Sequence, residues 1–191
     1  NTASFLGGGV CTVSGDVTVS GGAISGNTAS TGGGAGTFSG DVTVSGSGAI
    51  SGNTAANGGG GVYAGEGTVN VTGGLISGNT AETGDGGGVF AGLGAVTVSG
   101  DGEISDNEAG DDGGGVFASS GAVTISGDGE ISGNAADRFG GGVYAYSGAV
   151  TVSGDGAITG NEALSNGGGV YAWSGNINVS GGEISGNDAG G

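Results

Sequence analysis

Valine, isoleucine and alanine recur at alternate positions in short runs, which are separated by turns rich in glycine. The segment from residue 140 to residue 163, GGGVYAYSGAVTVSGDGAITGNEA, contains three such runs. Short runs with a two-residue period indicate β-strands whose two faces differ, and no copy shows the period of an amphipathic helix. The pattern therefore predicts an all-β chain.

The same pattern repeats along the whole chain, with a step of about 27 residues in most copies and a slightly shorter step in the first. Strands this short are not stable alone, but equivalent strands of successive copies can pair and bury a continuous core. We therefore expect a right-handed parallel β-helix, a three-faced β-solenoid of seven rungs of about 27 residues, as one domain over residues 1–191. The first apolar position of the rungs is held by Val10, Ala35, Val62, Val89, Val116, Val143 and Val170.

Alternation assigns an inside and an outside to each rung. In the rung that begins at Gly140, Val143, Val150 and Ile158 should point inward, and Tyr144 should point outward. The alanine that follows each asparagine turn should close the third corner. The asparagines should form an outward column, tolerate a left-handed backbone and bond from rung to rung through their amides. This column is Asn1, Asn27, Asn53, Asn79, Asn107, Asn134, Asn161 and Asn187.

The second run of each rung carries outward hydroxyl groups, and its flanks are uncharged in the later rungs. A flat array of this kind resembles the T-x-T faces of ice-binding solenoids, where regularly spaced hydroxyls and methyls order surface water. The alternative is that serine and threonine are ordinary outward residues of strands. The candidate hydroxyl face comprises Thr18, Ser20, Thr43, Ser45, Thr72, Thr97, Ser99, Thr124, Ser126, Thr151 and Ser153.

An outward column of aromatic residues follows the first runs. Two interpretations stay open: the rings stack on one another and stiffen the sheet, or they form an apolar stripe for a partner, a sugar ring or a neighbouring coil. The candidate aromatic face comprises Tyr63, Phe90, Phe117, Tyr144, Tyr146, Tyr171 and Trp173.

The charge of the chain is lopsided, with 18 acidic residues, one cation (Arg138), no histidine and a net charge of −17. This balance disfavours binding to nucleic acid or to anionic membrane surfaces. No stretch approaches about 18 consecutive apolar residues, so we expect no membrane insertion. The single cysteine, Cys11, rules out a disulfide framework, and we expect it to be a small surface residue in an aromatic position.

Acidic residues collect at the turns of the later rungs. Their oxygen atoms suit a hard cation such as calcium, and a solvated acidic surface is the alternative. Asp106, Asp111 and Asp112 are the weak calcium candidates, and we expect no other cofactor.

The chain lacks a recognisable catalytic set. Without histidine or lysine a serine nucleophile has no base, and Arg138 is the only basic side chain. Glu103 and Glu130 should lie on adjacent rungs, but nothing in the sequence marks one of them as the acid of a glycosidase pair. We therefore expect a protein that is not an enzyme.

The pattern GGGVYA…SGAVTVSG…ISGN-x-A resembles right-handed β-helix repeat proteins of microbial cell surfaces, which include adhesin-like proteins and the passenger regions of polymorphic outer-membrane proteins. The G-G-A-I tetrapeptide of the latter occurs at residues 21–24, with relatives at 73–76 and 181–184. The resemblance covers the full chain and implies an extracellular, non-enzymatic stalk, adhesin or fibre subunit. Ice binding, and carbohydrate binding along the aromatic column, are the alternative functions.

The two ends of the sequence are in phase with each other. The chain begins at an asparagine turn and ends in the same turn at residues 186–191, without an amphipathic cap. Because open parallel edges tend to associate, we expect either a segment of a longer coil or coils that stack end to end.

Overall fold

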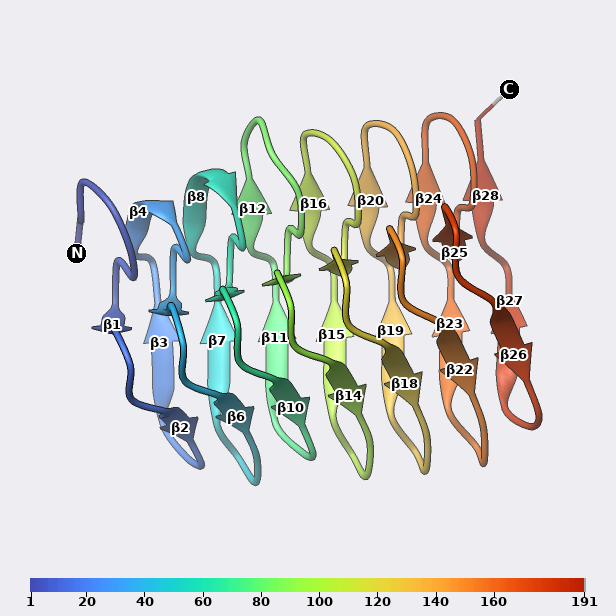
Figure 1. Ribbon diagram of the computed structural model, residues 1–191, viewed down its shortest axis with the longest axis horizontal. Helices are drawn as coiled ribbons and strands as arrows, with labels where there is room; N and C mark the ends of the chain where they lie inside the picture. Colours follow the sequence, from blue (N-terminus) through green and yellow to red (C-terminus); the bar gives the residue numbers. More distant parts are fainter. Residues whose placement is uncertain (191) are drawn as a thin grey trace.

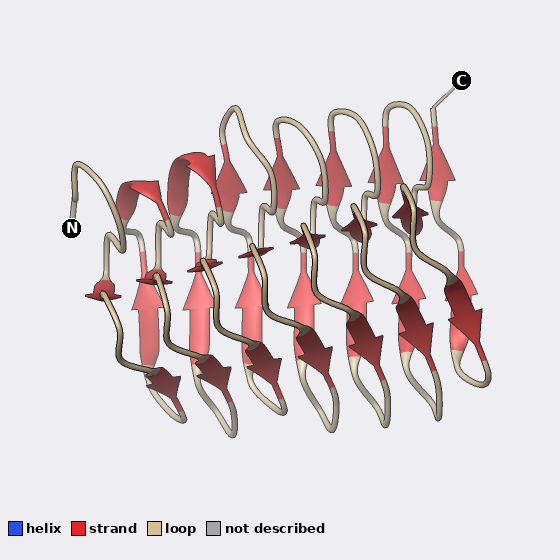
Figure 2. Cartoon of the chain, viewed as in Figure 1, coloured by secondary structure: helices blue, strands red, loops and turns tan. Residues whose placement is uncertain are grey.

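A computed structural model describes residues 1–190, and every regular element in that range is a β-strand (Figure 2). The strands are parallel, and equivalent strands stack turn upon turn at the spacing of the sequence repeat. This arrangement confirms the expected β-solenoid of about seven rungs. Gly191, the last residue of the C-terminal turn, lies outside the described residues.

Each rung contributes one strand to each of four seven-stranded sheets, numbered 1 to 4 in chain order. Sheet 1 contains β1 (Val10–Thr12), β5 (Ala35–Thr37), β9 (Val62–Ala64), β13 (Val89–Ala91), β17 (Val116–Ala118), β21 (Val143–Ala145) and β25 (Val170–Ala172). Sheet 2 contains β2 (Val17–Val19), β6 (Val42–Val44), β10 (Val69–Val71), β14 (Val96–Val98), β18 (Val123–Ile125), β22 (Val150–Val152) and β26 (Ile177–Val179). Sheet 3 contains β3 (Ala23–Ser25), β7 (Ala49–Ser51), β11 (Leu75–Ser77), β15 (Glu103–Ser105), β19 (Glu130–Ser132), β23 (Ala157–Thr159) and β27 (Glu183–Ser185). Sheet 4 contains β4 (Thr28–Thr31), β8 (Thr54–Gly58), β12 (Thr80–Ala81), β16 (Glu108–Ala109), β20 (Ala135–Ala136), β24 (Glu162–Ala163) and β28 (Asp188–Ala189).

The coil advances from left to right in Figure 1, from the N-terminus to the C-terminus. The nearer strand β2 runs downward, and the more distant, fainter strand β3 runs upward. A path that descends in front and rises behind while it moves to the right is a right-handed coil, as parallel crossovers require.

Sheet 4 is a fourth hydrogen-bonded sheet, in addition to the three strand runs per rung that the sequence predicts. Most of its strands are two residues long, too short to show an alternating pattern. Their inner residue is the alanine that was expected to close the third corner. Ala81 and Ala109 pair with each other and are fully buried. The corner alanines are therefore core residues, and they also belong to a hydrogen-bonded sheet.

The core is a set of apolar columns that run the length of the coil. In β22, Val150 and Val152 are fully buried while Thr151 between them is partly exposed, and Ile158 of β23 is fully buried. The predicted alternation is thus confirmed. Burying each of these larger side chains contributes roughly 1.5–3 kcal/mol, so the stacked columns are the main source of stability.

In sheet 1 the register between rungs holds across the change in repeat length. Val10 pairs with Ala35 across the shorter first step, and Cys11 pairs with Gly36 in the column that holds the aromatic residues. Cys11 is exposed and free. The expected place of Cys11 is confirmed.

The asparagine column lies inside the coil, which corrects the expectation of an outward column. Asn53, Asn79 and Asn134 are fully buried. The side-chain amide and the backbone N–H of Asn79 both donate to Oδ1 of Asn107, at 2.9 Å and 3.0 Å, and the amide also donates to the carbonyl of Ile50. The amide groups tolerate burial because the asparagine of each rung forms hydrogen bonds with the asparagine of the next rung. The expected bonding between rungs is therefore confirmed, and the expected outward direction of the column is wrong.

The left-handed backbone lies one residue before each asparagine, which corrects a second expectation. Gly78 and Gly133 have φ values of +60° and +64°. In the fourth rung Asp106 takes this position with a φ of +55°, the one positive φ among the described residues other than glycine. The turn therefore favours a residue without a Cβ, and the asparagine that follows is free to point inward.

Candidate functional surfaces

The hydroxyl face is the outer side of sheet 2. Thr97 pairs with Thr124, and Thr124 pairs with Thr151, so these side chains form one straight column. All three are partly exposed. Parallel strands lie about 4.8 Å apart, which sets the spacing of the hydroxyls along the coil.

Asparagine replaces threonine at two points of this column. Asn70 stands between Thr43 and Thr97, and Asn178 follows Thr151. The amide of Asn70 donates to Oγ1 of Thr68 at 3.1 Å. The regular array of hydroxyls is therefore interrupted in the third and the last rung.

The second column of the face begins one residue beyond the strands. The backbone N–H of Ser126 still donates to the carbonyl of Val98 at 3.0 Å, so the sheet pairing continues to this position. The structure thus brings the predicted hydroxyl residues together on one side. The members of this second column are Ser20, Ser45, Thr72, Ser99, Ser126 and Ser153.

The aromatic column of sheet 1 is a stack of rings. Phe90 lies between Tyr63 and Phe117, with ring centroids at 5.1 Å and 5.0 Å, and Phe117 stacks on Tyr144 at 5.2 Å. Tyr144 continues the stack to Tyr171 at 5.6 Å. Each inner ring therefore uses both faces on its neighbours and offers its edge to a ligand.

Burial follows from this stacking. Tyr144 is 5% exposed although its strand directs it outward, and burial raises the pKa of its hydroxyl to about 12. Phe139 adds to the stack from the preceding corner, with its centroid 4.8 Å from that of Tyr171. Sequence reasoning missed Phe139, because its position in a glycine-rich turn gives no alternation to read.

Tyr146 and Trp173 form a separate exposed pair. Their centroids are 6.4 Å apart with an angle of 7° between the planes, and the two residues are 49% and 57% exposed. They do not belong to the main stack, so the candidate aromatic face consists of two groups of residues.

Three carboxylates meet at the corner between sheets 4 and 1. Oxygen atoms of Asp85, Asp111 and Asp112 lie within 4.8 Å of one another. Asp106 is exposed and stands before β16, while Asp111 and Asp112 follow that strand, so the three calcium candidates do not form one group. The residue that sequence reasoning missed is Asp85. It precedes Asp112 by one full repeat, which is the signal that could have found it.

Hydrogen bonds fix the geometry of this corner. The backbone N–H of Asp112 donates to Oδ1 of Asp85 at 3.1 Å, and the N–H of Phe139 donates to Oδ1 of Asp112 at 3.2 Å. Arg138 donates to Oδ1 of Asp111 at 2.6 Å, and its guanidinium lies 4.9 Å from the centroid of the Phe139 ring. These carboxylates could hold a cation, and Arg138 already neutralises one of them.

The surroundings of Asp85 and Asp112 raise the pKa values of their carboxyl groups. Burial, with smaller contributions from the charges of Asp111 and Asp112, raises the pKa of Asp85 to about 6. Burial and the charge of Asp111 likewise raise the pKa of Asp112. The side-chain hydrogen bond to Asp111 raises the pKa of Arg138. The corner therefore takes up a proton more readily than an exposed acidic turn.

Glu103 and Glu130 lie opposite each other on the neighbouring strands β15 and β19, as expected. Both side chains are partly exposed on the outer side of sheet 3. No basic side chain accompanies them in sheet 3, whose strands all belong to the described residues.

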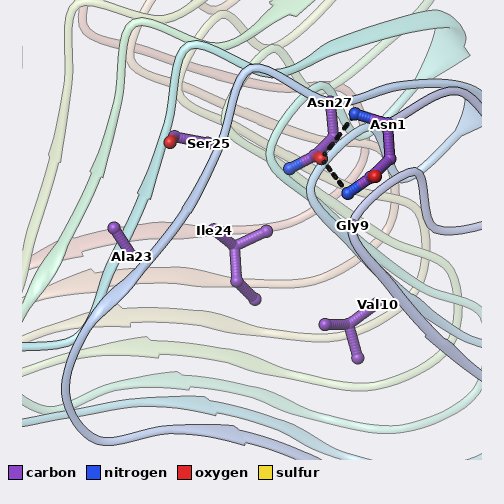
Figure 3. Close-up of a pocket in the computed structure, with 7 residues that line it drawn as sticks. All are labelled: Asn1, Gly9, Val10, Ala23, Ile24, Ser25 and Asn27. Carbon is purple, nitrogen blue, oxygen red and sulfur yellow. Dashed lines mark hydrogen bonds between the residues drawn. The ribbon is translucent and has the colours of Figure 1, made fainter.

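A hollow of about 270 Å³ lies at the N-terminal face of the coil (Figure 3). Its side chains are apolar or uncharged. The α-amino group and the side-chain amide of Asn1 donate to Oδ1 of Asn27 at 3.1 Å and 2.9 Å, as the dashed lines show. The lining residues are Asn1, Gly9, Val10, Ala23, Ile24, Ser25 and Asn27.

Within residues 1–190 the structure contains no helix that could cross a membrane. The chain matches no protein family model, no curated protein and no solved structure.

Proposed function

We propose that this chain is a rigid, non-enzymatic structural segment of an extracellular protein, as a stalk, an adhesin passenger region or a fibre subunit. The observation that carries the proposal is the continuity of the inner columns. Each rung bonds through its asparagine to the next rung and packs its valines and isoleucines on those of the next rung. A stack of this kind transmits force and holds distance without a binding cleft.

The surface supports the same conclusion. The aromatic rings stack mainly on one another, and no buried side-chain nitrogen or oxygen of the described residues lacks a hydrogen-bond partner. The net charge of −17 keeps a long polymer soluble and discourages nonspecific association with other acidic surfaces. The resemblance of the repeat to cell-surface β-helix proteins supports the extracellular setting.

The spacer role can be tested by removing one rung. Donor and acceptor fluorescent proteins are fused to the two ends, and residues 89–115 are deleted, which joins equivalent positions of successive rungs. We expect the deleted protein to fold and its ends to approach by about 4.8 Å, seen as higher energy transfer.

A flexible Gly/Ser linker of the same length is the control for this measurement. Its energy transfer should be broadly distributed and should respond weakly to a deletion of the same size. The spacer role is excluded if the intact chain behaves like this linker, or if the in-phase deletion unfolds it.

The second candidate function is ice binding by the hydroxyl face. The observation that favours it is the straight register of Thr97, Thr124 and Thr151 on one exposed sheet. Thr124→Tyr would break the plane of the face, and Ser132→Tyr is the matched control on sheet 3. Thermal hysteresis in the parent that Thr124→Tyr abolishes and Ser132→Tyr retains would support this function. A parent without hysteresis removes it.

A further inference from the structure

The two asparagines of the hydroxyl face share a sequence feature. Asn70 is followed two residues later by Thr72, and Asn178 by Ser180. Of all the asparagines in the chain, these are the two that have a hydroxyl residue at this distance. The pattern N-x-S/T is the acceptor sequence for N-linked glycans in secreted proteins.

The fold directs both partners of each pattern outward. Successive side chains of a strand alternate, so Asn70 and Thr72 lie on the same outer side while Val71 between them is fully buried. Asn70 is partly exposed and Thr72 is exposed. The acceptor amide and the hydroxyl that the pattern requires are therefore accessible in the middle of the coil.

The inward asparagines differ in every one of these properties. Asn79 is fully buried, its amide is bonded to Ile50 and Asn107, and the residue two positions later is Ala81. The amide of Asn70 instead makes one hydrogen bond, to Thr68. One of its two amide hydrogens is thus directed to no protein acceptor.

The surroundings of Asn70 leave room for a bulky group. Its neighbours in the column are Thr43 and Thr97, whose side chains are short. On one flank lie Thr68 and Ala95, which are also small. A sugar ring above Asn70 would meet hydroxyl groups that can donate and accept hydrogen bonds.

We propose that Asn70 and Asn178 are sites of N-linked glycosylation. The amide nitrogen forms a bond to the anomeric carbon of an oligosaccharide carried on a polyprenyl diphosphate. The bond between that carbon and the diphosphate oxygen breaks, the diphosphate leaves with the electron pair, and the amide nitrogen loses one proton. The inference rests on the proposed extracellular function, because such transfer takes place on secreted chains.

A glycan at Asn70 has a consequence for the hydroxyl face. It would stand in the middle of the threonine column and cover the neighbouring rungs, so ice could not reach a continuous array. The modified face would be hydrated and non-adhesive, which suits a stalk.

The test is secretion of the full chain from a glycosylating eukaryotic cell. A cleavable leader precedes the chain, and a flexible tag that carries a reference N-x-T sequence follows it. Protein is purified through the glycan of the tag, so that every molecule studied has met the transferase. Enzymatic deglycosylation in heavy-oxygen water then converts each modified asparagine to a labelled aspartate that peptide mass spectrometry identifies.

We expect label at Asn70 and Asn178 and none at Asn176, an exposed asparagine that has no hydroxyl residue two positions later and no glycine after it. Thr72→Val should abolish label at Asn70 alone, and Ser180→Val should abolish label at Asn178 alone. Thermal melts of the variants report whether the coil still folds. The proposal would be overturned if Asn70 carried no label in protein whose tag is glycosylated. The energy-transfer measurement on the coil is unaffected by this result, so the spacer role stands or fails separately.

Discussion

Each position of the coil occurs once in every rung, so the residues at equivalent positions show which conformation and environment that position imposes. Asp106 departs from its column, because it holds a left-handed backbone where each of the other rungs has glycine. A left-handed conformation costs an L residue about 1–2 kcal/mol, and aspartate tolerates it better than most. Asp85 departs in another way, since it is a carboxylate withdrawn from water beside two others.

Asp106→Gly should raise the free energy of unfolding by about 0.5 kcal/mol, because relief of strain exceeds the greater freedom of glycine in the unfolded chain. Urea unfolding followed by circular dichroism measures the change. Asp101→Gly is the matched control, since Asp101 is exposed and has no positive φ, and it should not stabilise the protein. Equal effects of the two substitutions would contradict the role of strain.

Asp85→Asn should stabilise the protein at pH 8 and have little effect below pH 4. The folded pKa of about 6 lies above the ordinary aspartate pKa of 3.8, so the contribution of Asp85 to stability is full below pH 3.8 and is lost as the pH rises through 6. Partial exposure screens the charges, and we expect a gain of about 1 kcal/mol at pH 8. The introduced asparagine would keep an oxygen to accept from the N–H of Asp112.

Urea unfolding at pH 4, 6 and 8 at constant ionic strength measures this dependence. Asp101→Asn, at an exposed turn, is the control for loss of one negative charge. A difference between Asp85→Asn and the parent that is constant with pH, or that grows toward low pH, would contradict a raised pKa.

At the scale of the strand, contacts within the columns of equivalent residues stabilise the folded coil. The aromatic stack outside the coil connects the third rung to the seventh, and the asparagine column inside the coil connects every rung to the next. The loss of one member therefore affects contacts to two rungs at once.

Asn107→Ala should destabilise the protein by roughly 3–5 kcal/mol. The substitution leaves the backbone N–H and one side-chain amide hydrogen of Asn79 without an acceptor, and Oδ1 of Asn134 without its side-chain donor, in a buried site. Denaturant unfolding gives the value. Asn57→Ala is the control, because Asn57 is exposed and bonded to Ser30, and it should change stability by less than about 0.5 kcal/mol. Similar losses for both would show that the inner column contributes little.

Phe117→Ala should cost roughly 2–3 kcal/mol, since it removes two ring stacks and the area that they bury. Phe5→Ala, at a ring that is 63% exposed, should cost much less. Thermal unfolding of the two variants compares them directly. A larger effect of Phe5→Ala would argue that the stack does not stiffen the sheet.

The sequence predicted the strands of sheets 1 to 3 almost residue by residue. Each of these strands contains alternating apolar and outward-facing residues, and the same alternation occurs in every copy of the repeat. Val143–Ala145 and Glu130–Ser132 are strands with those bounds. Sheet 4 and the inward asparagines were not predictable in this way. A two-residue strand has no period. The expected amide bonds between rungs can form on either side of the coil, so they did not show that the asparagines point inward.

At the scale of the whole molecule, the coil is a rod whose rungs contact mainly their neighbours. The hydroxyl and aromatic columns that the sequence indicated are real surfaces, because register follows from the repeat. The carboxylate corner was predicted only in part: the one-repeat spacing places Asp85 and Asp112 in one column, but it does not show the burial that raises the pKa of Asp85. A function that depends on the number of rungs and on their stiffness requires no sequence motif. The periodicity of the sequence therefore predicts the rod, but it does not predict where the protein acts.

The distance between two spin labels tests the rod most directly. Cys11 is the single native cysteine and is exposed, and Ser174→Cys adds a second exposed site in the last rung. Six steps of about 4.8 Å separate the two rungs, so pulsed electron paramagnetic resonance should give one narrow distribution near 30 Å, unchanged by salt. A broad distribution, or a distance that moves with ionic strength, would contradict a rigid seven-rung coil.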